Sequence, residues 1–186
     1  GYSITKLSST TNGLFVAVEG ATIRNLAIGN AKIAMEESDG NVGVLVGRAN
    51  GATVENVVIA SSKITTPVAE TSELGGMIGY VNGAVTISNS EIRRLTIRTA
   101  GMTCGVGGFV GLADASVRMQ NCNIANSYVR NTLATEDGHM AIFMGGVVGY
   151  ATAPINATEV SATAMNLQVA SPVKGMGTIA GRLTGE

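Results

Sequence analysis

One short pattern recurs along the whole chain and constrains its fold more than any other feature of the sequence. The pattern reads glycine, a variable residue, two apolar residues and a small residue, and its six copies occupy 13–17, 43–47, 75–79, 107–111, 145–149 and 177–181. The first glycines of successive copies lie 30, 32, 32, 38 and 32 residues apart. This self-similarity predicts a repeat protein with a unit of about 32 residues and an insertion in the fourth unit.

A second pattern, an apolar residue, a polar residue and asparagine, follows the first four glycine anchors at a nearly constant distance. The asparagines are Asn25, Asn56, Asn89 and Asn121, and the corresponding segment of the fifth unit ends in Glu159. Five positions after the first apolar residue of each triplet come Ile28, Ile59, Ile92, Ile124 and Ala162. Ten positions after it come Ile33, Ile64, Ile97, Val129 and Leu167.

These apolar segments are brief and rich in Val, Ile and Thr, with turn residues between them, which predicts three short strands in each repeat. Stacked repeats would pair each strand with its counterpart in the next unit at about 4.8 Å. We therefore expect an all-β fold, a right-handed parallel β-helix (β-solenoid) of about five coils. The whole chain, 1–186, is expected to be a single domain and a fragment or processed part of a longer protein, since it lacks an initiator Met.

Two sets of apolar residues are predicted to form stacked interior columns in this fold. The first contains Phe15, Leu45, Met77, Phe109, Val147 and Ile179 or their immediate neighbours, and the second contains Ile28, Ile59, Ile92 and Ile124. The asparagines Asn25, Asn56, Asn89 and Asn121 are predicted to form a structural ladder, because amides stacked at a bend can hydrogen-bond along the axis. The anchor glycines are expected to permit sharp turns or close approach of neighbouring coils.

The anchors and the segments that follow them resemble the GLUG-motif repeats. The segment 75–90 carries this resemblance most fully, and the opening 1–4 followed by 13–15 is similar to the start of such an array. The resemblance implies a secreted or surface-attached bacterial protein, because these repeats occur in adhesin-like proteins and in non-catalytic parts of immunoglobulin A protease-type polypeptides. The motif is structural and therefore indicates architecture more than activity.

The composition argues against several classes of function. The formal charge of −1 and the absence of a dense Lys/Arg cluster in the sequence speak against a nucleic-acid partner. The apolar runs are too short to span a membrane, so no membrane insertion is expected. We expect no catalytic residues, no metal and no cofactor, since Glu55, Glu91, Asp114 and Glu159 fall in different columns and the single histidine lacks a zinc-binding partner.

Acidic residues gather between the third predicted strand of a unit and the next anchor. They are Glu36, Glu37, Asp39, Glu70, Glu73, Glu136 and Asp137. Stacking would place these segments on one edge, as a solvated rim, a partner-binding edge or, at Glu36, Glu37, Asp39 and Asn41, a calcium site. Cys104 and Cys122 have no metal-ligand spacing and are either buried free thiols or a disulfide.

The insertion of the fourth unit, from Arg130 to Met144, is the predicted site of recognition, because insertions in repeat proteins commonly gather on a binding face. Its candidate binding residues are Glu136, Asp137, His139 and Phe143, although packing of the apolar part on the coil is an alternative. The expected function is a non-catalytic adhesin-like module, extracellular or on the cell surface. Its expected partners are a host or matrix protein or glycan, or neighbouring copies of the chain. The alternatives are a non-catalytic segment of a secreted protease or glycan-active enzyme and a subunit of a self-assembling fibre.

Overall fold

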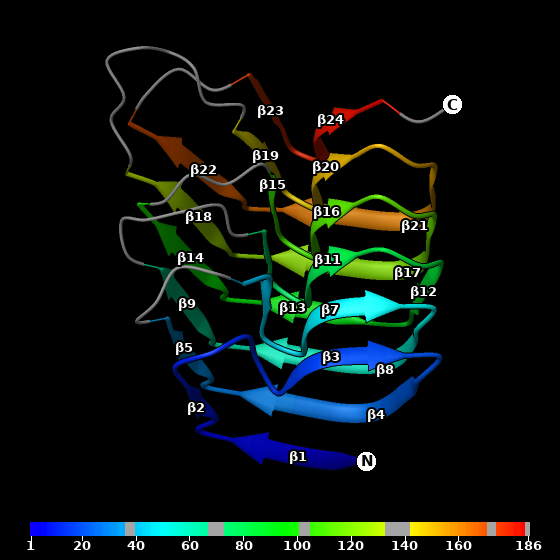
Figure 1. The fold of residues 1–186 in the computed structure, drawn as a ribbon. Coiled ribbons are helices and arrows are strands. Elements are labelled where there is room, and N and C mark those ends of the chain that lie inside the picture. The colour runs from blue at the N-terminus through cyan, green and yellow to red at the C-terminus, as the bar shows by residue number, and fades with distance from the viewer. Residues whose placement is uncertain (36–39, 67–72, 101–104, 133–141, 171–173, 185–186) are drawn as a thin grey trace.

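The protein is an all-β structure of four parallel sheets, as seen in a computed structural model (Figure 1). The structure describes residues 1–35, 40–66, 73–100, 105–132, 142–170 and 174–184, and these residues contain no helix. The strands rise in chain order from β1 to β24, so that the N-terminus and the C-terminus lie at opposite ends of the stack (Figure 1). The predicted all-β class with parallel pairing is confirmed.

We call the four sheets A, B, C and D. Sheet A contains β1 (Tyr2–Thr5), β4 (Thr22–Gly29), β8 (Thr53–Ala60), β12 (Val85–Ser88), β13 (Glu91–Arg93), β17 (Val117–Ala125) and β21 (Ile155–Thr163). Sheet B contains β2 (Ser8–Ser9), β5 (Lys32–Ala34), β9 (Lys63–Thr66), β14 (Thr96–Thr99), β18 (Tyr128–Asn131) and β22 (Asn166–Val169). Sheet C contains β3 (Phe15–Glu19), β7 (Val46–Asn50), β11 (Ile78–Val81), β16 (Val110–Ala113), β20 (Val148–Ala151) and β24 (Ala180–Leu183). Sheet D contains β6 (Val42–Gly43), β10 (Leu74–Gly75), β15 (Gly105–Gly107), β19 (Phe143–Gly145) and β23 (Gly175–Gly177).

The expectation of three strands in each repeat is wrong, because the glycine anchor itself forms the corner between two sheets. In the central repeat, β10 of sheet D ends at Gly75 and β11 of sheet C begins at Ile78. A Cβ on Gly75 would collide with the backbone oxygen of Ile78, and a Cβ on Gly76 with that of Gly108 in the next repeat. Close approach of two backbones therefore accounts for glycine at these two anchor positions.

The register of the sheets follows the repeat. Each strand pairs with the equivalent strand of the next repeat, at an offset of 24 residues where Tyr2 meets Leu26, of 31, 32 or 33 residues in the following repeats, and of 38 residues where Asn123 meets Ser161. The offset is still 32 where Thr99 meets Asn131 in sheet B, and it is 38 where Gly105 meets Phe143 in sheet D. The extra residues of the fourth unit therefore lie between Asn131 and Phe143, within the predicted insertion.

The core lies between the sheets and consists of stacked apolar columns. Ile28, Ile59, Ile92 and Ile124 are 0–1% exposed and pair in register, as predicted. In the other predicted column the buried members are Leu45, Met77, Phe109 and Val147. The end members Phe15 and Ile179 are 39% and 46% exposed. Phe15 pairs with Val46 and not Leu45, so the first anchor is displaced by one residue from the alignment that its glycine predicts.

Candidate functional site

The four predicted ladder asparagines lie in one column at a bend within sheet A. Asn25, Asn56, Asn89 and Asn121 have φ values of 57°, 52°, 49° and 51°, in the left-handed region. Asparagine adopts this region more readily than other side chains that carry a Cβ, because its short amide can bond to nearby backbone. The left-handed backbone conformation therefore accounts for asparagine in this column. The periodic asparagines in the sequence indicated this bend.

The asparagine amides form two hydrogen-bonded pairs. Asn56 Nδ2 donates to Asn25 Oδ1 at 2.8 Å, and Asn121 Nδ2 donates to Asn89 Oδ1 at 2.9 Å. Among the described residues no hydrogen bond joins the amides of Asn56 and Asn89, so the ladder is not continuous. All four side chains are exposed at the surface, and Asn25 and Asn56 line an open hollow of about 320 Å³ beside Tyr2.

A second column of left-handed residues lies five positions after the first and was not predicted from the sequence. Its members are Lys6, Asn30, Ser61, Arg94, Asn126 and Ala164, with φ values between 49° and 63°. This bend turns the chain from sheet A into sheet B. Because the residue types vary along this column, no repeated residue in the sequence indicated the bend. Glu159 in the first column also keeps a φ of 54°, so the fifth repeat retains the bend without the asparagine.

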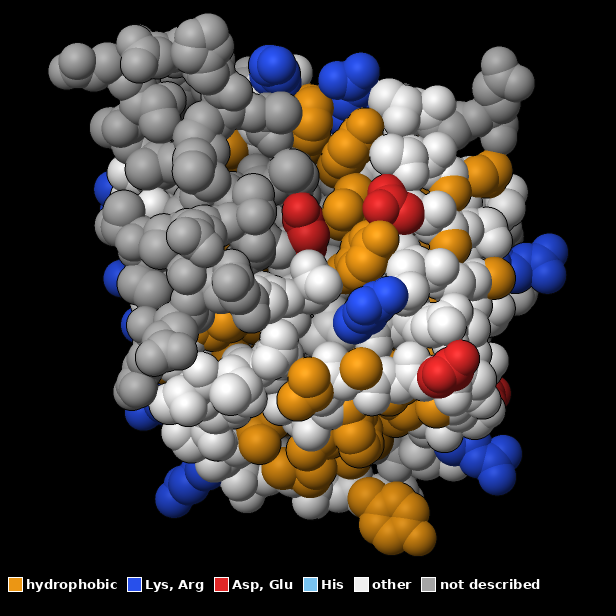
Figure 2. Space-filling view, in the orientation of Figure 1, with side chains coloured by type: hydrophobic (Ala, Val, Ile, Leu, Met, Phe, Trp, Pro, Cys, Tyr) orange, Lys and Arg blue, Asp and Glu red, His pale blue; other side chains and the backbone are white. Residues whose placement is uncertain are grey.

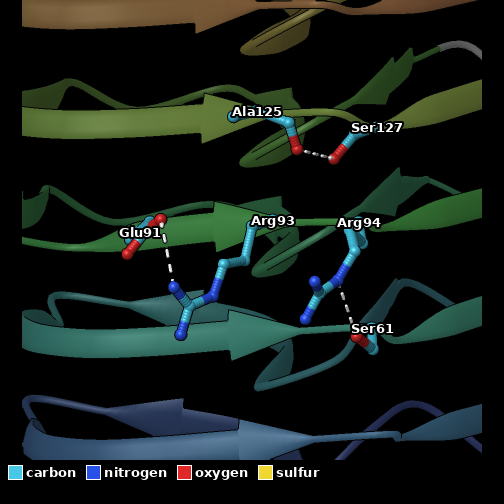
Figure 3. Close-up of polar contacts among 6 residues, drawn as sticks. All are labelled: Ser61, Glu91, Arg93, Arg94, Ala125 and Ser127. Carbon is cyan, nitrogen blue, oxygen red and sulfur yellow. Dashed lines mark hydrogen bonds and ion pairs between the residues drawn. The ribbon is translucent and has the colours of Figure 1, made fainter.

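Buried serines join successive repeats directly after these bends. Ser127 Oγ donates to the carbonyl oxygen of Ala125 at 2.9 Å (Figure 3) and accepts a hydrogen bond from the backbone nitrogen of Leu95 at 3.1 Å. Ser62 makes the same two contacts, with the oxygen of Ala60 and the nitrogen of Ala31. These hydroxyls satisfy backbone groups inside the stack and are structural.

The candidate binding loop is only partly described by the structure. Glu136, Asp137 and His139 lie outside the described residues. Phe143 lies in β19 and is 3% exposed, with its ring centroid 4.7 Å from that of Tyr150 and the Arg182 guanidinium 5.2 Å above it. The prediction that Phe143 contributes to an exposed binding loop is therefore wrong, because the aromatic ring packs against the stack.

Most of the predicted acidic edge also lies outside the described residues, namely Glu36, Glu37, Asp39, Glu70, Glu136 and Asp137. Glu73 is described and is not part of a solvated rim. Its side chain is 8% exposed, and its Oε2 accepts a hydrogen bond from the backbone nitrogen of Gly105 at 2.6 Å. Of the candidate calcium ligands only Asn41 is described, and it is half-buried.

The described carboxylates of sheet A lie apart from one another in the register. Glu55 pairs with Ser88 and Glu91 with Asn123, so these acids occupy different columns, as predicted. Asp114 accepts hydrogen bonds from Tyr80 Oη at 2.9 Å and Thr152 Oγ1 at 2.8 Å. Burial raises the pKa of Tyr80, and the neighbouring Asp114 raises that pKa further. Within the described ranges no group of three His, Cys, Asp or Glu residues could hold a metal ion.

Cys122 is a buried free thiol in β17, whereas Cys104 lies outside the described residues. The Cys122 Sγ lies 3.4 Å from the oxygen of Gln120 and 3.5 Å from that of Ile87. Burial raises the pKa of the thiol, because the thiolate would lose its hydration. The group is therefore held protonated and is a structural cysteine rather than a reactive one.

Comparisons with protein-family models, with curated proteins and with solved structures found no match. In the part of the chain that the structure describes, no helix is long and apolar enough to cross a membrane.

Proposed function

We propose that the chain is a right-handed parallel β-helix of about five coils that serves as a non-catalytic module of a secreted or cell-surface, adhesin-like protein. The observation that carries this proposal is the register. Strands of all four sheets pair in parallel with their counterparts one repeat further along, which is the pairing expected of a coil. The right hand follows from the strong preference of parallel crossover connections for that hand. The likeness of the anchors to GLUG-motif repeats supports the surface location and a bacterial source.

The proposed task of the stack is to give reach and rigidity to recognition segments on one edge. The six residues by which the fourth unit exceeds the others lie between Asn131 and Phe143, where the strands on both sides keep their pairing. A coil does not need these residues, and loops of repeat proteins commonly bind partners. Host or matrix proteins and glycans are the partners that suit such a module.

Deletion of residues 135–140 restores the common repeat length and tests this proposal. We expect the shortened chain to keep its β circular dichroism and to lose binding to matrix proteins or host cells. A matched variant of unchanged length, with Glu136, Asp137 and His139 replaced by serine, separates the loss of side chains from the loss of length. Undiminished binding in both variants would contradict a recognition role for the insertion.

Self-assembly is the second candidate function, in which the outermost repeats of one copy pair with those of another. The exposed large apolar side chains of the described residues all belong to the first or last repeats, among them Tyr2 at 80%, Val16 at 59% and Leu183 at 56%. Another coil could cover such ends by the same parallel pairing. A sedimentation coefficient that rises with concentration would support the fibre, whereas a constant one would favour the single module. The remaining alternative, a non-catalytic segment of a secreted protease or glycan-active enzyme, assigns the same task to the stack.

A further inference from the structure

One face of the stack is strongly basic, although the sequence spreads its charges from Lys6 to Arg130. Seven of the 12 Lys and Arg residues lie on the outer surface of sheet B, on the bend that leads into it, or at the adjoining end of β13 in sheet A. They are Lys6, Lys32, Lys63, Arg93, Arg94, Arg98 and Arg130, and all are exposed. We call this set the basic face. Basic side chains project along the left-hand edge in Figure 2, the side on which sheet B lies in Figure 1.

The fold creates the basic face by stacking. Lys32 pairs with Lys63 across β5 and β9, and Arg98 pairs with Arg130 across β14 and β18. Neighbouring strands lie about 4.8 Å apart, so like charges are neighbours along the axis. Such pairs repel one another unless a counter-charge lies between them. The result is one pair of adjacent cations in each of the two outward columns of sheet B, Lys32 with Lys63 and Arg98 with Arg130.

The part of the chain that the structure describes offers one carboxylate partner to the basic face. Among the described residues the one ion pair joins Arg93 to Glu91, at 3.9 Å between largely exposed groups (Figure 3). Arg94 Nε donates instead to Ser61 Oγ of the preceding repeat at 3.0 Å (Figure 3), which positions the guanidinium along the stack axis. The Arg98 guanidinium lies 6.0 Å from the centre of the Tyr128 ring. Within the described ranges, the other members of the basic face form no ion pair.

Hydroxyl and amide side chains fill the positions between these cations. In the two outward columns of sheet B, Lys63 is followed by Thr96 and Tyr128, and Arg130 by Gln168. Arginine binds carboxylate and sulfate groups through two parallel hydrogen bonds, and neighbouring hydroxyls and amides can bond to sugar hydroxyls. The face therefore combines paired positive charges with neutral polar groups.

We propose that the basic face binds a linear acidic glycan, carboxylated or sulfated, lying along the stack axis. This inference rests on the proposed function, because it takes the chain to be a binding scaffold, and it adds a ligand class and a second binding surface. A nucleic acid is the less suitable polyanion. Single-stranded binders stack bases on successive aromatic rings, and Tyr128 is the one aromatic side chain among the described residues of this face.

The test measures binding of the chain to heparin and to polygalacturonate, which separate sulfated from carboxylated glycans, with dextran as the neutral control. We expect binding to at least one acidic glycan, no binding to dextran, and an affinity that falls as salt rises. A triple variant, Lys63→Gln, Arg94→Asn and Arg98→Gln, should weaken binding at least about tenfold. Asparagine is chosen at 94 because that position has a φ of 53°.

The matched control removes three exposed arginines elsewhere, with Arg24→Gln, Arg48→Gln and Arg118→Gln. This variant has the same net charge as the first and should weaken binding by less than about threefold. An equal loss in both variants would overturn the proposal, as would equal or tighter binding of oligothymidylate, or no binding to either acidic glycan in 50 mM salt. The chain that lacks residues 135–140 distinguishes glycan binding by the basic face from glycan binding by the insertion. Glycan binding that persists there supports the basic face independently of the insertion, and glycan binding lost only there assigns the ligand to the insertion.

Discussion

Each repeat depends on two residues held in the left-handed region, one at the bend within sheet A and one at the turn into sheet B. At the first bend, four of the five repeats use asparagine and the fifth uses Glu159, with a φ of 54°. At the second bend, Ala164 has a φ of 49°. The left-handed region places the Cβ close to a carbonyl oxygen, so residues without a local hydrogen bond carry strain there. The fifth repeat therefore contains backbone strain at Glu159 and Ala164 that a substitution can relieve.

We expect Glu159→Asn to stabilise the protein by about 0.5–1 kcal/mol, because asparagine relieves this strain and restores the column. The free energy of unfolding from urea titration measures the effect. Glu55→Asn is the matched control, since Glu55 is an exposed strand residue without a positive φ. A gain of equal size at Glu55 would show that removal of charge, and not backbone conformation, is responsible.

Asn121 donates and Asn89 accepts in their side-chain hydrogen bond, so replacement by aspartate should change stability differently at the two positions. In Asn121→Asp a carboxylate oxygen replaces the donor and faces Asn89 Oδ1, which we expect to cost about 1 kcal/mol at neutral pH. Asn89→Asp keeps an acceptor for Asn121 Nδ2 and should cost less. Melting temperatures of the two variants at pH 7 decide the matter, and equal values would contradict the pairing.

The Cys122 thiol predicts a loss of stability at alkaline pH. Because its pKa is raised in the folded protein, the unfolded chain loses the proton first as pH rises above about 8.5. The contribution of the protonated thiol is complete below that pH and declines above it, up to the higher pKa of the folded state. Unfolding free energies of the wild type and Cys122→Ser, compared at pH 7 and 9.5, should converge or reverse at the higher pH. A constant difference would contradict the raised pKa.

The elements of the fold are held in place by apolar columns that run through all repeats. Ile92, in the middle of its column, is fully buried between Ile59 and Ile124. Each repeat supplies only a few such residues, so no repeat can bury its apolar face alone. The stability of a strand therefore depends on the strands above and below it.

Truncation of this column in the middle of the stack should be costly. We expect Ile92→Ala to reduce the free energy of unfolding by about 2–5 kcal/mol, through lost burial and the cavity left behind. The neighbouring Arg93 is exposed, and Arg93→Ala should change stability by less than about 0.5 kcal/mol. A loss below about 0.5 kcal/mol for Ile92→Ala would contradict the register of sheet A.

The elements were predictable where a physical requirement repeats as a residue type. Glycine at a backbone contact, asparagine at the first bend and isoleucine in the core satisfy this condition. They indicated the period, the parallel sheets and the buried column of Ile28, Ile59, Ile92 and Ile124. The second bend escaped prediction because Ser61 and Arg94 share only a backbone conformation. Phe143 was misassigned because its apolar character fitted both a loop and a strand, and only the tertiary context distinguishes them.

At the scale of the whole molecule, the properties that matter are the stacking direction and the faces it creates. Residues about 32 positions apart become neighbours, which gathers Lys63, Arg98 and Arg130 on one surface although no segment of the sequence is strongly basic. Any function of the molecule that depends on these faces depends on the register.

Disulfide trapping between predicted neighbours tests the register most directly. In a chain with Cys104→Ser and Cys122→Ser, we would place cysteines at Thr86 and Arg118, which pair in sheet A, or at Thr86 and Gln120, two residues out of register. Paired positions on parallel strands lie about 4.8 Å apart, within the range that a disulfide spans, whereas the displaced pair lies beyond about 7 Å. We expect rapid crosslinking of the first pair, with retained β circular dichroism, and little crosslinking of the second. Equal crosslinking of both pairs, or preferential crosslinking of the displaced pair, would contradict this register.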